Sequence, residues 1–198
     1  DIAACVPPTD GGYADDLLRA SIESFFIEHP LVKLLIGGLV INARAETPFV
    51  FVDVGAGFGS YTIPALLHGG KVLSFEPDKT CFHALLANIA SNVSNFAPGF
   101  QSDCYDLALL DEKTEGYIHD PLQLGAQAPV FKSTTLDALL AERGVSKVDA
   151  IKIDTEGCEA RVLLGAKNLI ARCHPVLQIE SHKFIRSDET EKDLLERF

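Results

Sequence analysis

Several features that would assign this chain of 198 residues to other protein classes are missing. Its five cysteines are odd in number and widely scattered, and no two form a C-x-x-C pair. This spacing argues against a disulfide framework or a structural zinc site, and we expect reduced thiols in a cytoplasmic protein. Methionine is absent and the sequence begins at Asp1, so we expect a fragment or a processed chain.

Long apolar runs and clusters of basic residues are missing as well. The longest apolar candidate, residues 31–41, is interrupted by Lys33 and by two glycines, and we recognise no signal peptide, so we expect no membrane contact. Only 17 Lys and Arg stand against 28 Asp and Glu, for a net charge of −11. Because proteins that bind nucleic acid need clustered cations, we expect no nucleic-acid partner.

What the chain does contain is a glycine-rich turn directly after an apolar segment. Residues 49–54 are mostly β-branched or aromatic, which favours a buried strand, and Gly55, Gly57 and Gly59 follow at every second position. Glycine lets the backbone adopt positive φ and lets a ligand approach the main chain without meeting a Cβ. The following helix points its N-terminal amides at the same place. The stretch therefore predicts a loop that holds a nucleotide-like ligand.

Strands and helices alternate along the rest of the chain, as in βαβ units with right-handed crossovers. The predicted strands are residues 49–54, 71–76, 101–110, 148–154 and 175–180. We therefore predict an α/β fold, a three-layer α/β/α sandwich with a mostly parallel sheet.

Helix ends are also visible in the sequence. Asp78 and Thr135 are suited to begin helices as N-caps, and Gly144 is suited to end the second of these. Other segments with a prediction are helices over 13–27, 61–67, 162–170 and 187–198, a small antiparallel excursion within 111–133, and residues 31–43, which stay open between helix and strand.

Polar residues or glycines stand at the end of each predicted strand. Because an open parallel sheet binds ligands beyond the carboxyl ends of its strands, these groups should meet in one crevice. Glu76, at the end of the second strand, can accept hydrogen bonds from both hydroxyls of a ribose, which suits nicotinamide adenine dinucleotide (NAD) and S-adenosylmethionine (SAM) alike. The G-x-G-x-G spacing places the third glycine one residue earlier than in the G-x-G-x-x-G loop typical of NAD proteins, which disfavours NAD.

Several motifs follow one another between residues 49 and 182. They are F-V-D-V-G-A-G-F-G at 51–59, F-E-P at 75–77, T-L-D at 135–137, V-D-A-I-K-I-D-T-E-G at 148–157 and P-V-L at 175–177. Together they resemble the FkbM-type family of SAM-dependent methyltransferases, and the K-I-D-x-E-G block is the most specific of them. The resemblance implies a Rossmann-like class I methyltransferase fold, SAM as cofactor, and transfer of a methyl group to a hydroxyl oxygen.

The resemblance also implies roles for individual residues. The residues expected around the methionine part of SAM are Asp53, Gly55, Ala56, Gly57 and Gly59. Glu76 would bind the ribose and Asp106 would lie on the adenine side. Asp154 and Glu156 would face the sulfonium and the acceptor, where their negative charge suits a cationic cofactor.

A hydroxyl acceptor must lose its proton as the methyl group moves from sulfur to oxygen. His182, Glu156 and Asp154 are the candidate catalytic bases, in that order. The same three residues could instead bind a divalent cation, but no further carboxylate motif supports this, and we expect no metal.

We predict an N-terminal leader and helical cap over residues 1–48 and a SAM-dependent methyltransferase domain over residues 49–198. Class I methyltransferases usually finish the sheet with an antiparallel hairpin, whereas this sequence stops in the preceding helix. The last strands are therefore missing from this fragment, or the edge is completed differently. The predicted function is O-methylation of a small-molecule or glycan-type hydroxyl. An N-methyltransferase, an NAD-dependent oxidoreductase and a non-catalytic SAM-binding module stay open as alternatives.

Overall fold

The computed structural model describes residues 30–42, 48–117 and 130–180. The segment that the sequence left open between helix and strand forms helix α2 (Pro30–Asn42). Its proline stands in the first turn, where a missing N–H costs no helical hydrogen bond. The predicted helices over 13–27 and 187–198 lie outside the described residues. No helix in the described part of the chain is long and apolar enough to cross a membrane.

A five-stranded sheet forms the centre of the molecule, and all its described strand pairs are parallel, which confirms the predicted mostly parallel sheet. Its strands are β1 (Val50–Val54), β2 (Lys71–Phe75), β3 (Gln101–Tyr105), β7 (Ala150–Ile153) and β8 (Val176–Ile179). They lie in the order β3-β2-β1-β7-β8. The chain first builds outward from β1 and then crosses to its other side, so the topological switch point lies between β1 and β7. Open α/β sheets bind ligands at this point.

The third predicted strand, residues 101–110, proved too long. Strand β3 ends at Tyr105, which is paired with Phe75, the last residue of β2. Beyond Phe75 the chain turns away through Pro77 into the next helix, so the ladder has no partner strand to continue on. Residues 108–109 instead form β4 (Ala108–Leu109) in a second sheet with β5 (Thr114–Tyr117) and β6 (Val130–Thr134). Strands β5 and β6 are antiparallel, which confirms the predicted excursion.

The remaining helices are α3 (Thr62–Leu67), α4 (Lys79–Asn92), α5 (Leu136–Glu142), α6 (Glu159–Gly165) and α7 (Lys167–Cys173), with a short 3₁₀ turn η1 (Val93–Asn95) after α4. Both predicted N-caps are confirmed. The Asp78 carboxylate accepts the Cys81 N–H at 2.8 Å, and the Thr135 hydroxyl accepts the Ala138 N–H at 3.1 Å.

The single helix predicted after the fourth strand is divided into α6 and α7. The Asp137 carboxylate on α5 accepts the N–H groups of Asn168 and Leu169 at 2.9 and 2.7 Å, and so begins α7 as a new helix. Gly165 ends α6 at the point where a Cβ would lie 1.9 Å from the carbonyl oxygen of Leu110. Contacts with distant parts of the chain therefore place this break.

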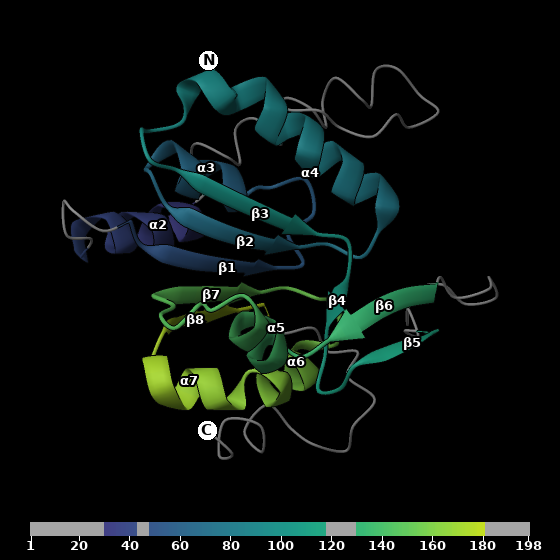
Figure 1. Ribbon diagram of the computed structural model, residues 1–198. Helices are drawn as coiled ribbons and strands as arrows, with labels where there is room; N and C mark the ends of the chain where they lie inside the picture. The colour runs from purple at the N-terminus through teal and green to yellow at the C-terminus, as the bar shows by residue number, and fades with distance from the viewer. Residues whose placement is uncertain (1–29, 43–47, 118–129, 181–198) are drawn as a thin grey trace.

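Two apolar clusters, one on each face of the sheet, form the core. Phe51 belongs to the cluster under α2 and α3, whereas its neighbour Val52 belongs to the cluster under α5, α6 and α7. This alternation is the period of two expected for a strand buried on both faces. The result is the predicted three-layer arrangement. Figure 1 shows the small sheet β4-β6-β5 beyond the end toward which β1, β2 and β3 point.

Candidate functional site

The glycine loop after β1 is held between the ends of β2 and β7. The N–H groups of Gly55 and Ala56 both donate to the carbonyl oxygen of Phe75, at 2.9 and 3.0 Å. Gly55 has φ +71°, and a Cβ there would lie 1.7 Å from the carbonyl oxygen of Asp154. Glycine is required at this position because the loop passes directly against the end of β7.

Glu76 binds the loop at Gly57 through a hydrogen bond. Its side chain is almost fully buried, and its Oε2 accepts the Gly57 N–H at 2.8 Å, while Oε1 accepts the Asp78 N–H at 2.9 Å. Burial raises the pKa of Glu76, and these two backbone hydrogen bonds partly oppose the rise. Each carboxylate oxygen has a second lone pair, so Glu76 keeps capacity to accept two further hydrogen bonds.

Gly57 differs from the other two loop glycines. It has φ +54°, and among the described residues an added Cβ would meet nothing within 4 Å beyond its immediate chain neighbours. Gly59 also has positive φ, but a Cβ there would lie 2.8 Å from Cδ1 of Leu85 on α4. The open side of the loop is therefore at Gly57, while Gly55 and Gly59 serve contacts within the protein.

A row of buried polar side chains crosses the sheet beneath this loop. Strand register places Ser74, Asp53 and Lys152 side by side. Asp53 is fully buried, and its Oδ2 accepts a hydrogen bond from the Thr62 hydroxyl at 2.7 Å. The Thr62 hydroxyl in turn lies 2.8 Å from the Ser74 hydroxyl. Asp53 thus lies under the loop, joined to α3 and β2.

Lys152 is the cation of this row, and sequence reasoning assigned it no role of its own. Its side chain is 5% exposed, and Nζ donates to the carbonyl oxygen of Gly55 at 2.6 Å. The same nitrogen lies 3.6 Å from Oδ1 of Asp53 and 3.5 Å from Oδ2 of Asp154. A lysine in the middle of an apolar strand was the available signal, because a buried ammonium needs polar partners.

The turn after β7 carries the acids predicted to face the acceptor. Asp154 retains 28% side-chain exposure, and Glu156 is exposed. Glu156 has φ +54°, a conformation that costs energy for a residue with a Cβ. Glu159 closes the turn, because its Oε1 accepts the N–H groups of Thr155 and Gly157, both at 3.0 Å. Glu159 lies in the first turn of α6.

Asp106 stands apart from this group. Asp106 follows the carboxyl end of β3, is exposed, and forms a hydrogen-bonded ion pair with Lys79, which lowers the pKa of the Asp106 carboxyl. His182 lies outside the described residues. Among the described residues, no three or more His, Cys, Asp or Glu side chains are placed to hold a metal ion together.

Another residue that sequence reasoning missed supports the loop from α4. The Asn88 side chain is buried and its Nδ2 donates to the carbonyl oxygen of Phe58 at 2.8 Å. Its place three residues after Leu85, on the apolar face of the helix, was the only sequence signal. The structure thus brings Asp53, the glycine loop and Asp154 together at the switch point, with Glu76 across the loop.

Comparison with known proteins gives a match over most of the chain. Residues 53–197 match the family model described as the methyltransferase FkbM domain. A tRNA (guanine(37)-N(1))-methyltransferase from Anopheles gambiae is 35% identical over an alignment of 101 residues that covers 45% of this chain and 18% of that protein. The chain therefore spans less than a fifth of that curated relative.

Solved structures with a similar arrangement are more distant in sequence. Magnesium protoporphyrin IX methyltransferase from Synechocystis, with bound SAM, is 14% identical, with a TM-score of 0.48 over 94% of this chain and 71% of that chain. A SAM-dependent methyltransferase from Agrobacterium tumefaciens is 14% identical, with a TM-score of 0.46 over 77% of this chain and 44% of that chain.

Proposed function

Because this chain belongs to the FkbM family of SAM-dependent methyltransferases, we propose that it transfers the methyl group of SAM to a hydroxyl oxygen. The proposed acceptor is a small molecule or a glycan-type molecule. The family supplies the reaction class and the cofactor. The geometry of the loop after β1 supports the assignment of individual residues.

The observation that carries the proposal is the pairing of Glu76 with the open side of the loop. The Glu76 carboxylate is fixed 2.8 Å from the Gly57 N–H and keeps free acceptor capacity, and the space beside Gly57 would be filled by a Cβ. These residues fit a ribose carried by an adenosine cofactor. We propose that Glu76 binds the ribose hydroxyls, that Gly55–Gly59 border the methionine part, and that Asp106 lies toward the adenine.

Asp53 has a different place in this proposal from the loop itself. Its carboxylate is fully buried and hydrogen-bonded to Thr62, so we propose that it supports the loop from within the core. Ala56 is also buried, at 2% exposure, so its backbone rather than its side chain would border the cofactor.

Bound SAM supplies an electrophilic methyl group, and this chain must then remove a proton from the acceptor hydroxyl. We propose His182, Glu156 and Asp154 as candidate bases. Support for Asp154 comes from its carboxylate, which lies 3.5 Å from the Lys152 nitrogen that donates to the Gly55 carbonyl oxygen. The exposed side chain of Glu156, on a backbone with positive φ, lies in the same turn, and strained backbone often occurs at functional sites.

The Anopheles relative favours a second candidate, N-methylation of a guanine in RNA, because its name gives that reaction. The net charge of −11 weighs against it, since RNA binding depends on phosphate neutralisation by basic residues. Isotope-labelled methyl groups on SAM distinguish the two candidates. We expect the label in an O-methyl product of hydroxyl-bearing acceptors and no label in tRNA. Labelled N-methylguanine in tRNA would instead favour the second candidate function over the first.

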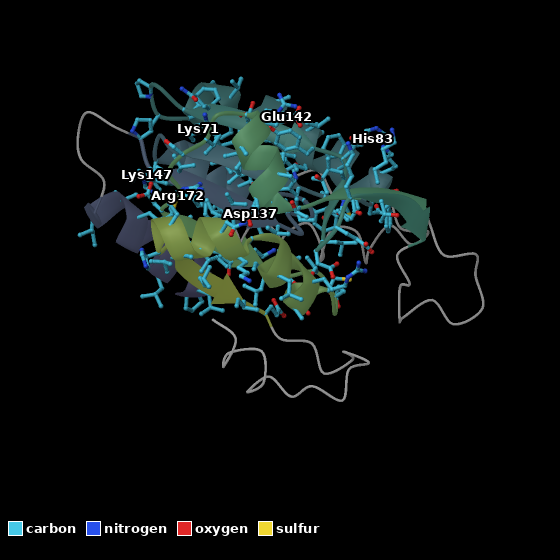
Figure 2. All side chains as sticks on the ribbon, turned by 60° about the horizontal axis from the view of Figure 1, so that its bottom comes forward. Lys71, His83, Asp137, Glu142, Lys147 and Arg172 are labelled. Atoms are coloured by element: carbon cyan, nitrogen blue, oxygen red, sulfur yellow. The ribbon has the colours of Figure 1, made fainter. Side chains whose placement is uncertain are left out.

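Calorimetry tests the cofactor site. We expect SAM and its product S-adenosylhomocysteine (SAH) to bind the wild type, and Glu76→Gln to weaken both by about 10- to 100-fold, because a hydrogen bond to a charged acceptor contributes about 1.5–3 kcal/mol. The matched control is Glu142→Gln, an exposed acid on α5 (Figure 2), which should leave both affinities unchanged. Tight NAD binding by the wild type would overturn the cofactor assignment.

Turnover tests the bases separately. His182→Ala and Glu156→Gln should each be measured for methyl transfer and for SAH affinity. Loss of transfer with retained SAH binding is expected for the residue that takes the proton. A variant with unchanged transfer removes that residue from the candidates.

A further inference from the structure

Lys152 joins two parts of the site that are far apart in the sequence, and it lies 97 residues after Gly55 itself. Its ammonium donates to the carbonyl oxygen of Gly55 in the loop after β1, and it lies 3.5 Å from the carboxylate of Asp154 at the end of β7. The loop and the end of β7 already touch, because the backbone of Gly55 passes against the Asp154 carbonyl. Lys152 is the side chain that spans this contact.

In the two ion pairs described for Lys152, one cation faces two acids. One ammonium lies between two carboxylates, those of Asp53 at 3.6 Å and Asp154 at 3.5 Å, which leaves a formal charge of −1. Asp53 is fully buried, whereas Asp154 is partly exposed. Of the two carboxylates, the partly exposed Asp154 is therefore the one that a positively charged ligand can approach.

We propose that Lys152 is a positioning residue for methyl transfer, which tethers the cofactor loop to Asp154 and whose positive charge offsets part of the carboxylate charge near the sulfonium. This inference rests on the proposed function, because the sulfonium belongs to SAM. The tether acts through the Gly55 carbonyl, so it should affect every ligand of the loop. The charge offset acts only on a ligand that carries the positive charge.

SAM and SAH separate these two effects, because SAM carries a sulfonium and SAH a neutral thioether. Lys152→Met keeps the length of the side chain and removes its charge and its hydrogen bond. We expect SAH binding to weaken about tenfold or more, because the Gly55 carbonyl loses a charged donor. SAM binding should weaken less, because the two carboxylates of Asp53 and Asp154 then carry a formal charge of −2 between them.

The ratio of the SAH to the SAM dissociation constant should therefore rise on the order of fivefold, the factor that corresponds to about 1 kcal/mol for one unit charge. Calorimetry at mildly alkaline pH, where carboxylates are ionised, measures both constants. Lys167→Met, at an exposed lysine on α7, is the matched control and should change neither. A merely structural role for Lys152 predicts equal weakening of both ligands, and that result would overturn the proposal.

A double variant covers the case in which Lys152→Met does not fold. Asp53→Asn with Lys152→Met removes the buried anion together with its cation and restores the formal charge of −1. SAH should still bind about tenfold more weakly than to the wild type, with the ratio back at its wild-type value. Wild-type SAH affinity in this variant would show that the tether is not needed. Failure of the wild type to bind SAM would instead contradict the proposed function.

Discussion

Substitution of Gly57 by alanine tests whether the open side of the loop is where the cofactor lies. Gly57 and Gly55 both have positive φ, +54° and +71°, so alanine is strained at either position. Their surroundings differ. An added Cβ at Gly57 meets no described atom within 4 Å, whereas at Gly55 it would lie 1.7 Å from the Asp154 carbonyl oxygen.

The expected cost to folding follows from this difference. For Gly57→Ala, the left-handed conformation costs about 1–2 kcal/mol, and the reduced entropy of the unfolded chain returns roughly 0.4–1 kcal/mol. The net cost of at most about 1.6 kcal/mol should lower Tm by no more than about 6 °C. For Gly55→Ala, overlap with the carbonyl adds about 1–3 kcal/mol. With the same entropy return, the total of about 1–5 kcal/mol should lower Tm by roughly 2–20 °C.

Ligand affinity should show a large effect even in the well-folded variant. A methyl group at Gly57 occupies the space assigned to the cofactor, and overlap of this kind costs about 1–3 kcal/mol, which weakens SAH binding from about fivefold to more than a hundredfold. Circular dichroism gives Tm, which suits a chain without tryptophan, and calorimetry gives the SAH affinity. If Gly57→Ala bound SAH as tightly as the wild type, the space beside Gly57 would not be the cofactor site.

Two further predictions concern carboxylates of the site. Burial raises the pKa of Glu76 in the folded protein. The stability that Glu76 contributes is therefore greatest at low pH, and it declines as pH rises from the ordinary pKa of about 4.3 through the raised pKa. SAH affinity should rise over the same pH window. Urea unfolding and calorimetry across that window should show both trends in the wild type, and neither trend should remain in Glu76→Gln. Glu156→Gly removes the strain of the positive φ and should raise Tm by up to about 2–4 °C, while methyl transfer should fall. A variant that is stabilised and fully active would exclude Glu156 as the base.

Local patterns in the sequence predicted most of the elements correctly. The apolar runs that became β1, β2 and β7 and the caps at Asp78 and Thr135 depend on residues close together in the chain, where period and capping chemistry decide the conformation. The errors occurred where distant contacts decide. Strand β3 ends where its partner β2 ends, and the helix after β7 is divided by the Asp137 carboxylate of α5.

Some properties of the glycine loop depend on neighbouring residues and others on tertiary contacts. The sequence by itself determined that a strand runs into a flexible G-x-G-x-G turn, and that an acid ends the next strand, because both depend only on neighbouring residues. Only the tertiary structure decided that Gly55 serves the contact with β7, that Gly59 serves the contact with α4, and that an added Cβ at Gly57 would meet no described atom within 4 Å. It also decided that Lys152 reaches the loop. The physical reason is that the atoms which would meet each Cβ, and the partners of a buried charge, come from segments that only folding brings together.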